Sequence, residues 1–236
     1  MLVLGLIETA LELVPPELTS HPAILQTAKM RGKAPEEILL DESLHSKAFQ
    51  SLKDAEKRGR PDIAHRSLLI ALDSVLARES QLELFVHTYS DEIILVKPGT
   101  RLPRRMPRFI GLMEQLLLNK RVPPNGDPLL EVVQGTLETH IQRIKPSKTI
   151  LLSEKGVPTS PTQLAKSLLN EANAVVLVGG FAHGSPQSNL SHLVDKRVSF
   201  DPETLPVSTI VGMLVHGVEQ VLDLSTRRFQ KSKNAV

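Results

Sequence analysis

This sequence predicts an α/β fold in which a mostly parallel sheet is flanked by helices on both faces. The main observation is the C-terminal third, where apolar runs of strand length alternate with segments of helical spacing. The chain of 236 residues can bury one large core, and 41% of its residues are hydrophobic. Because only 3% are aromatic and none is tryptophan, we expect an aliphatic core.

The N-terminal half opens with Leu2–Ile7, an apolar run of strand composition. Helical spacing follows at His21–Arg31 and stops at Gly32, and Pro61 suits the first position of a longer helix. That helix has an apolar stripe of Ile63, Leu68, Leu69, Leu72, Val75 and Leu76. The other expected elements are a short strand at Ile38–Leu40, a polar amphipathic helix at Ser43–Lys57, and strands at Leu82–His87 and Glu92–Val96 joined by the turn Tyr89-Ser90-Asp91.

The second half continues with a stiff loop, Pro98–Pro107, rich in proline and arginine. The elements expected after it are a helix at Phe109–Leu118, a turn cluster at Val122–Asp127, a helix at Thr136–Ile144, a strand at Thr149–Leu152, a helix from the Ser160-Pro161 cap to Asn170, strands at Ala174–Val178 and Arg197–Phe200, and a helix at Thr209–Leu224. The basic tail Arg227–Lys233 is expected to be frayed.

The composition excludes several classes of site. The chain has no cysteine, which removes disulfides, zinc–thiolate sites and cysteine nucleophiles. Its eight histidines show no His-x-His or His-x-x-x-His spacing, so we expect no metal. The apolar N-terminus, Met1–Ala10, lacks basic flanking residues, and Glu8 interrupts it, so we expect neither a signal peptide nor a membrane span. A net charge of +2 does not by itself indicate nucleic-acid binding, so any contact with RNA must come from a local basic patch.

Three glycines follow the strand Ala174–Val178, namely Gly179, Gly180 and Gly184. In an open α/β sheet, ligands bind just past the carboxyl ends of strands. The loop is neither a Walker A loop nor Gly-x-Gly-x-x-Gly, which suggests a ligand without a pyrophosphate, such as an adenosine. The alternative is a tight strand-to-helix turn. The segments Leu151–Gly156 and Leu205–Thr209 also follow strands and would converge with this loop if the strands are neighbours.

Arg60, Pro61 and Asp62 stand at the expected start of a helix. A carboxylate in the first turn complements the helix dipole, which alone accounts for Asp62. The functional alternative is an Arg60–Asp62 pair that grips or polarises a polar ring. His65, one turn further, is expected to be packed or solvated rather than catalytic.

Five cations without an acid among them fall between residues 97 and 108, and they are Lys97, Arg101, Arg104, Arg105 and Arg108. Arginine is the residue that contacts phosphate through two hydrogen bonds at once. The segment therefore predicts contact with RNA or phosphate, and the alternative is a solvated surface loop.

Four motifs occur in order along the chain. They are Arg-Pro-Asp-Ile-x-His-x-x-Leu-Leu-x-x-Leu-Asp-Ser at 60–74, Arg-x-x-Arg-x-x-x-Arg at 101–108 with Phe-x-Gly-Leu-Met-x-Gln-Leu-Leu after it, Gly-Gly-Phe-Ala-His-Gly at 179–184, and Leu-Pro-Val-Ser-Thr at 205–209. Together they resemble the ribosome-biogenesis methyltransferases of the SPOUT class, which modify pseudouridine in small-subunit rRNA. The resemblance covers nearly the whole chain.

The resemblance implies a single domain over 1–236 with a C-terminal trefoil knot, a family-specific insertion around 33–60 and an RNA-binding loop at 97–108. It implies a homodimer, which fits a last helix with a long apolar face (Val211, Leu214, Val215, Val218 and Leu222). It also implies S-adenosylmethionine bound by Leu152, Ser153, Gly179, Gly180, Gly184, Leu205, Pro206, Val207, Ser208, Thr209 and Ile210. The implied location is the cytoplasm, or the nucleolus in a eukaryote.

In the same family picture, Asp62 and Arg60 are catalytic, and Arg60, Arg101, Arg104 and Arg108 hold the RNA. The expected reaction methylates N1 of a pseudouridine, whose ring N–H must lose its proton. Asp62 either accepts that proton or fixes Arg60, which then stabilises charge on the ring. One alternative, a non-catalytic rRNA-binding assembly factor, uses the same binding residues. Another, a SPOUT enzyme that acts on tRNA, shares the knot but would not need the Arg-Pro-Asp-Ile element.

Overall fold

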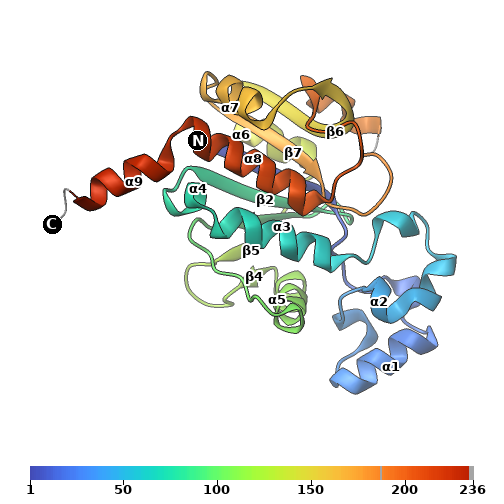
Figure 1. The fold of residues 1–236 in the computed structure, drawn as a ribbon. Helices are drawn as coiled ribbons and strands as arrows, with labels where there is room; N and C mark the ends of the chain where they lie inside the picture. Colours follow the sequence, from blue (N-terminus) through green and yellow to red (C-terminus); the bar gives the residue numbers. More distant parts are fainter. Residues whose placement is uncertain (187, 234–236) are drawn as a thin grey trace.

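In the computed structural model, which describes residues 1–186 and 188–233, an eight-stranded sheet forms the centre of the molecule (Figure 1). Its strands, in the order β4-β5-β3-β2-β1-β7-β6-β8 across the sheet, are β1 (Leu2–Thr9), β2 (Leu82–Thr88), β3 (Ile93–Val96), β4 (Arg121–Val122), β5 (Leu130–Val133), β6 (Lys148–Pro158), β7 (Ala174–Gly179) and β8 (Lys196–Ser199). The neighbouring strands β2, β1, β7, β6 and β8 pair in parallel, whereas β3, β5 and β4 pair antiparallel at one edge of the sheet.

Helices cover both faces of this sheet, as the sequence predicts (Figure 1). The α-helices are α1 (Pro22–Arg31), α2 (Glu42–His45), α3 (Pro61–Asp73), α4 (Val75–Arg78), α5 (Met106–Asn119), α6 (Leu137–Ile144), α7 (Pro161–Leu169), α8 (Val207–Val221) and α9 (Leu224–Lys233). One face packs against α3, α4, α5, α7 and α8, and the other against α6 and a 3₁₀ helix at Ser188–Leu193.

Strand β1 shows why the sheet is covered on both sides. Its side chains are all buried, and they alternate between the two cores: Leu4 and Leu6 face α3 and α8, whereas Val3 and Ile7 belong to the core under α6. A strand buried on both faces has a continuous apolar sequence, which is why it could be predicted.

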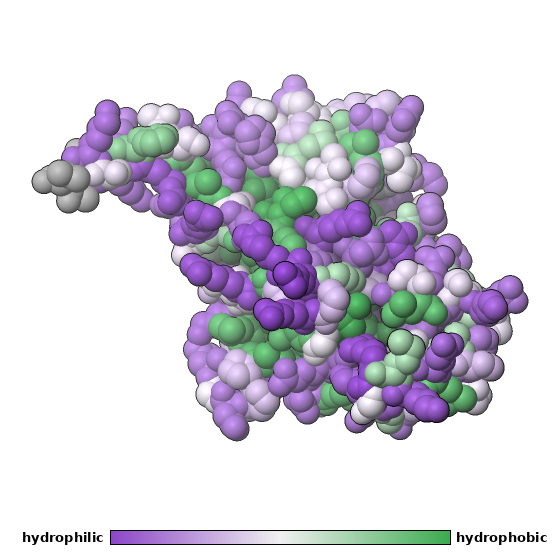
Figure 2. Space-filling view, turned by 60° about the horizontal axis from the view of Figure 1, so that its bottom comes forward, coloured by the Kyte–Doolittle hydropathy of each residue, from purple (hydrophilic) through white to green (hydrophobic). Residues whose placement is uncertain are grey.

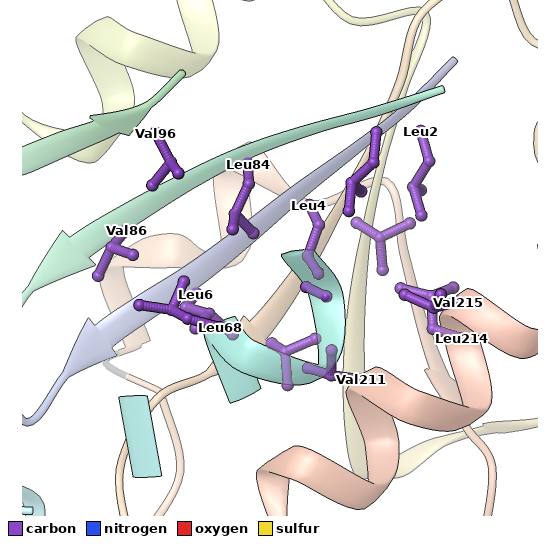
Figure 3. Packing of buried hydrophobic residues seen from close by; sticks show 14 of the residues in the cluster. Leu2, Leu4, Leu6, Leu68, Leu84, Val86, Val96, Val211, Leu214 and Val215 are labelled. Carbon is purple, nitrogen blue, oxygen red and sulfur yellow. The ribbon is translucent and has the colours of Figure 1, made fainter. Parts of the chain in front are cut away.

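The apolar face of α8 points into the sheet, as Figure 3 shows for Val211, Leu214 and Val215. These side chains, together with Val218, are buried within the chain itself. The interpretation of that face as a dimer surface is therefore wrong, because the sheet and the neighbouring helices already cover it.

Residues 10–60 form a separate lobe, seen at the lower right of Figure 1 with α1 and α2. It has its own small apolar cluster, which includes Ile24, Ile38 and Phe49. This cluster draws in residues from Val14 onward, so the lobe begins earlier than the insertion expected around 33–60. A knot at the C-terminal end of the sheet stays a prediction.

Several elements of the structure differ from those that the sequence predicts. The helix predicted at Ser43–Lys57 is wrong: α2 ends at His45, two short 3₁₀ helices follow, and Asp54 between them has a positive φ of 53°. Segment Ile38–Leu40 forms only an isolated bridge to Leu13. The helix predicted through Leu76 breaks at Ser74, which caps α4.

The ends of other elements also move. β6 continues to Pro158 through an irregularity in its pairing with β8. The tail Arg227–Lys233 is helical rather than frayed, since Glu79 pairs with Arg228 and Lys231.

Among the described residues, no single helix is long and apolar enough to span a membrane. Only α8 and α9 taken together meet the length and composition criteria, and they are bent by 54° relative to each other.

Candidate functional site

A cavity of 590 Å³ lies at the end of β7 and beside the middle of β6, where the pairing of these two parallel strands stops at Leu152 and Val178. Of the residues predicted to bind cofactor or base, those on its wall are Arg60, Asp62, Leu152, Ser153, Gly179, Gly184, Leu205, Pro206, Val207, Ser208 and Ile210. Parallel strands direct their carboxyl ends to one edge of a sheet, which brings together segments far apart in sequence. The expected convergence of the three segments is confirmed, but Leu151–Gly156 lies within β6 rather than after a strand.

Two predicted residues lie outside this wall. Gly180 faces β1: its N–H donates to the carbonyl of Ile7 at 2.7 Å, and its carbonyl accepts from the N–H of Ala10 at 3.1 Å. A Cβ at Gly180 would come within 2.4 Å of the Thr9 hydroxyl, so glycine is required there for close packing of two strand ends. Thr209 is exposed in the first turn of α8.

Residues 179–186, at the end of β7, contain the glycines that the sequence predicts to bind cofactor, and we call this segment the cofactor loop. Gly184 has a φ of +96°, a conformation that residues with a Cβ rarely adopt. Phe181 in the same loop is buried and forms part of the cavity wall. The loop thus presents both an aromatic ring and glycine backbone to the cavity.

The opposite part of the wall is the start of α8. This helix begins at Val207, two residues before the predicted start, and no side chain caps its N-terminus. Its first backbone N–H groups have no partner within the helix, and they carry the positive end of the helix dipole. Val207 and Ser208 bring this turn to the cavity.

Arg60 and Asp62 form a two-pronged ion pair at the start of α3. Arg60 donates from Nε to Oδ1 of Asp62 at 2.8 Å and from Nη2 to Oδ2 at 3.0 Å. Both side chains are about one-third exposed, 33% for Arg60 and 30% for Asp62. The hydrogen bonds from Arg60 lower the pKa of Asp62 below its usual value, against a smaller opposing effect of partial burial.

Sequence reasoning missed several residues of the wall. They are Val178, Pro186, Ser199, Phe200, Asp201, Glu203 and Thr204, which flank the predicted segments, so a wider window around each segment would have found them. Ile63, Arg66 and Glu154 also line the wall from inside predicted segments, and Phe181, Ala182 and His183 belong to the loop 179–184 that was expected at the cofactor. The carboxylates of Glu154, Asp201 and Glu203 make this part of the cavity acidic.

The basic segment predicted to bind RNA is not part of the cavity wall. His65, which the sequence indicated as packed or solvated, is buried under it, stacks on Phe109 and donates from Nε2 to the carbonyl of Pro103 at 2.7 Å. Because a carbonyl only accepts, Nε2 carries the proton. His65 therefore ties the segment to α3, the helix that carries Asp62.

The arginines of this segment are all exposed at the surface. Arg104 pairs with Asp73 at 3.0 Å, whereas Arg101 and Arg108 make no ion pair within residues 1–186 and 188–233. Helix α5 begins at Met106, so Arg108 lies in its first turn, where the helix dipole disfavours a cation. In the described part of the chain, no group of three or more His, Cys, Asp or Glu residues could hold a metal ion.

Comparison with known proteins gives a consistent result. A family model described as EMG1/NEP1 methyltransferase matches residues 4–219. A protein of Staphylothermus marinus named ribosomal RNA small subunit methyltransferase Nep1 is 44% identical over 220 residues, which cover 93% of this chain and 95% of that protein. A Thermococcus sibiricus protein of the same name is 44% identical over 219 residues, with coverages of 93% and 98%.

A solved structure has the same fold. The crystal structure of Archaeoglobus fulgidus Nep1 bound to S-adenosylhomocysteine has a TM-score of 0.84 and 35% sequence identity to this chain. The superposition covers 94% of this chain and 98% of the other.

Proposed function

This chain belongs to the EMG1/NEP1 methyltransferase family, and we propose that it methylates N1 of a pseudouridine in small-subunit ribosomal RNA, with S-adenosylmethionine as the methyl donor. The reaction would serve ribosome biogenesis. The observation that carries the proposal is the cavity at the strand ends, because the Arg60–Asp62 pair and the cofactor loop form parts of one wall.

The cavity fits S-adenosylmethionine in size and chemistry. Its 590 Å³ lies inside the range of about 300–1,000 Å³ that is usual for ligand sites. Apolar side chains such as Leu152 and Ile210 suit an adenine ring, and the acidic side chains Glu154 and Glu203 suit a cationic ligand. The uncapped first turn of α8 offers backbone N–H groups to a carboxylate. When bound, the cofactor supplies a methyl group activated by its positively charged sulfur.

For the reaction itself, we infer that Asp62 anchors Arg60 rather than accepting the proton of the ring N–H. Both carboxylate oxygens of Asp62 already accept hydrogen bonds from Arg60. Its lowered pKa also makes it a weak base, whereas a general base works best with a pKa near the working pH. Held in this orientation, the Arg60 guanidinium stabilises the negative charge that develops on the base as its proton leaves for water.

We propose that the rRNA lies over the start of α5 and the arginine segment before it. Arg105 and Arg108 stand at the positive end of that helix, an unfavourable position that a bound phosphate would relieve. Figure 2, which turns the lower side of the molecule forward, shows strongly hydrophilic side chains across the centre of this face. His65 links this surface to the helix of Asp62, so RNA bound there would lie close to the cavity.

A homodimer also remains a proposal, which rests on the resemblance to the knotted methyltransferases. It is tested by light scattering at micromolar protein concentration. A mass twice that of the 26.0 kDa chain is expected, and a mass near 26.0 kDa would refute it.

The proposed reaction is tested with an rRNA hairpin that carries one pseudouridine, incubated with the protein and methyl-labelled cofactor. Mass spectrometry should find one added methyl group on the pseudouridine hairpin and none on a matched uridine hairpin. Tight binding of the hairpin without transfer of the label would favour the alternative of a non-catalytic assembly factor. Equal labelling of both hairpins would refute pseudouridine as the target.

A further inference from the structure

Lys57 lies at the end of the lobe, in the 3₁₀ turn Ala55–Lys57, and its side chain leaves the lobe to contact the cofactor loop. Its ammonium donates to Oε2 of Glu8 at 2.9 Å and to the carbonyl of Ser185 at 2.6 Å. It also stands over the ring of Phe181, 4.9 Å from the centroid. One cation thus joins three segments that are distant in sequence: the lobe, the end of β1 and the cofactor loop.

The partner that holds this cation is itself fixed. The Glu8 side chain is only 4% exposed and that of Lys57 only 12%, so the pair is largely shielded from water. Glu8 has a φ of 47°, which is unfavourable for a residue with a Cβ and persists only where its surroundings impose it. One such constraint is the hydrogen bond that the Glu8 N–H donates to Nδ1 of buried His87 at 3.1 Å.

The contacts of Lys57 fall at both ends of the loop that faces the cavity. Phe181, below the ammonium, is part of the cavity wall, and so is Gly184, next to Ser185. A Cβ at Gly184 would lie 3.3 Å from Cε of Lys57, so the aliphatic stem also packs against the loop backbone. Besides Lys57, only a longer contact from Lys155 to the Ser185 hydroxyl, at 3.4 Å, joins Ser185 to another described side chain.

We propose that Lys57 is a positioning residue that holds the cofactor loop in its binding conformation, so that the lobe completes the cofactor site without touching the cofactor. This inference rests on the proposed function of the cavity. The competing explanation is purely structural, in which the Lys57–Glu8 pair only docks the lobe onto the sheet. The two differ in whether loss of Lys57 changes cofactor affinity in a protein that remains folded.

The test compares Lys57→Met with Lys57→Arg and with Lys47→Met, a control at an exposed lysine of the same lobe. Calorimetry with S-adenosylhomocysteine measures affinity without RNA or turnover. If the loop without Lys57 keeps its binding conformation about one-tenth of the time, the apparent Kd rises about tenfold. Arginine should restore part of the affinity because it keeps the charge, and the control should match the wild type.

Two further measurements exclude a mere loss of folding. Lys57→Met removes the cation that pairs with the buried Glu8 carboxylate, so the double variant Glu8→Gln with Lys57→Met, which removes both charges, should recover thermal stability. Affinity should stay weak in this double variant if Lys57 holds the loop. Amide hydrogen exchange of residues 181–185, measured without cofactor, should be faster in both variants. Recovery of affinity together with stability, or unchanged exchange, would overturn the proposal.

Turnover separates this inference from the proposed function. At saturating cofactor and RNA, Lys57→Met should keep a kcat within about threefold of the wild type, because the lost interaction affects binding rather than the reacting groups. A wild-type protein that binds S-adenosylhomocysteine but does not methylate the pseudouridine hairpin would refute the function and still allow the Lys57 comparison. A normal Kd in Lys57→Met would refute the Lys57 proposal alone.

Discussion

Asp62→Asn is the change that best tests the chemistry of the cavity. In the native protein, Arg60 donates two hydrogen bonds to the two oxygens of Asp62. Asparagine offers one acceptor oxygen and places an N–H₂ group where the second oxygen was, so one bond is lost and two donors face each other. The variant keeps the size of the side chain but releases the Arg60 guanidinium from its fixed orientation.

The structure gives the expected size of the effect. A hydrogen bond to a charged group contributes about 1.5–3 kcal/mol, which corresponds to about 10- to 150-fold in rate if it acts only in the transition state. Loss of a true general base would reduce the rate about 10²–10⁴-fold. If Asp62 anchors Arg60, we therefore expect the rate of Asp62→Asn to fall by about 10- to 150-fold. The rate of Arg60→Ala should fall further, because that variant lacks the guanidinium itself.

The assay is single-turnover methyl transfer at saturating cofactor and RNA, measured on both single variants and on the double variant. If the two residues act as one unit, the double variant should be no slower than Arg60→Ala. The control is Glu36→Gln, an exposed carboxylate of the lobe outside the cavity wall, which should keep its rate. A rate near that of the wild type in Asp62→Asn, or losses that multiply in the double variant, would refute the anchoring role.

Three further predictions concern other parts of the molecule. Gly184→Val should abolish S-adenosylhomocysteine binding in calorimetry while circular dichroism stays native, because its φ of +96° and its place on the cavity wall both exclude a branched side chain; unchanged affinity would refute it. Replacing Arg101 or Arg108 by Ala should reduce the slope of log binding constant against log salt concentration for RNA by about 0.7 per lost phosphate contact. Arg104→Ala should reduce this slope by less, because Arg104 already pairs with Asp73. Unchanged slopes in all three variants would show that the segment is a solvated surface loop that does not contact RNA. Burial lowers the pKa of His87, so on acidification the unfolded chain binds a proton at His87 before the folded chain does. The free energy of unfolding should therefore decrease as the pH falls below about 6.5, and His87→Gln should make this decrease smaller in denaturant titrations. An identical pH dependence in the variant would contradict the prediction.

The parallel centre of the fold and the loops at its carboxyl edge were predictable because their signals are local. β1 and β7 are fully or almost fully buried, so their sequences are apolar over Leu2–Ile7 and Ala174–Val178, and the glycines at the end of β7 mark where it stops. The cavity follows from one further rule, that ligands bind at the carboxyl ends of such strands.

The elements that could not be predicted depend on distant partners. Ser43–Lys57 has helical spacing, but Phe49 packs into the lobe cluster and Asp54 takes a positive φ, which breaks the segment into short turns. β5 contains Glu131 within an otherwise apolar run, and its strand conformation depends on pairing with β3. The ordered tail owes its contacts to Glu79, more than a hundred residues earlier. No sequence window of helix or strand length contains both partners.

The lobe is docked onto the body of the molecule largely through buried charge, and this has a consequence for its geometry. Glu114 on α5 is fully buried and binds Arg31 and Lys33 of the lobe, with Nη2 of Arg31 donating at 2.6 Å and Nζ of Lys33 at 2.7 Å. Within the lobe, Glu12 binds Arg58 at 2.6 and 2.7 Å, which holds the two ends of the lobe together where it joins β1 and α3. Buried ion pairs contribute little net stability, since desolvation offsets most of their attraction, but a displaced partner leaves an unpaired buried charge at high energy. Such pairs therefore fix where the lobe sits more than how strongly it is held. An apolar interface would tolerate sliding of the lobe, whereas the Glu114 pairs keep it in one register against α5, the helix that follows the arginine segment proposed to bind RNA.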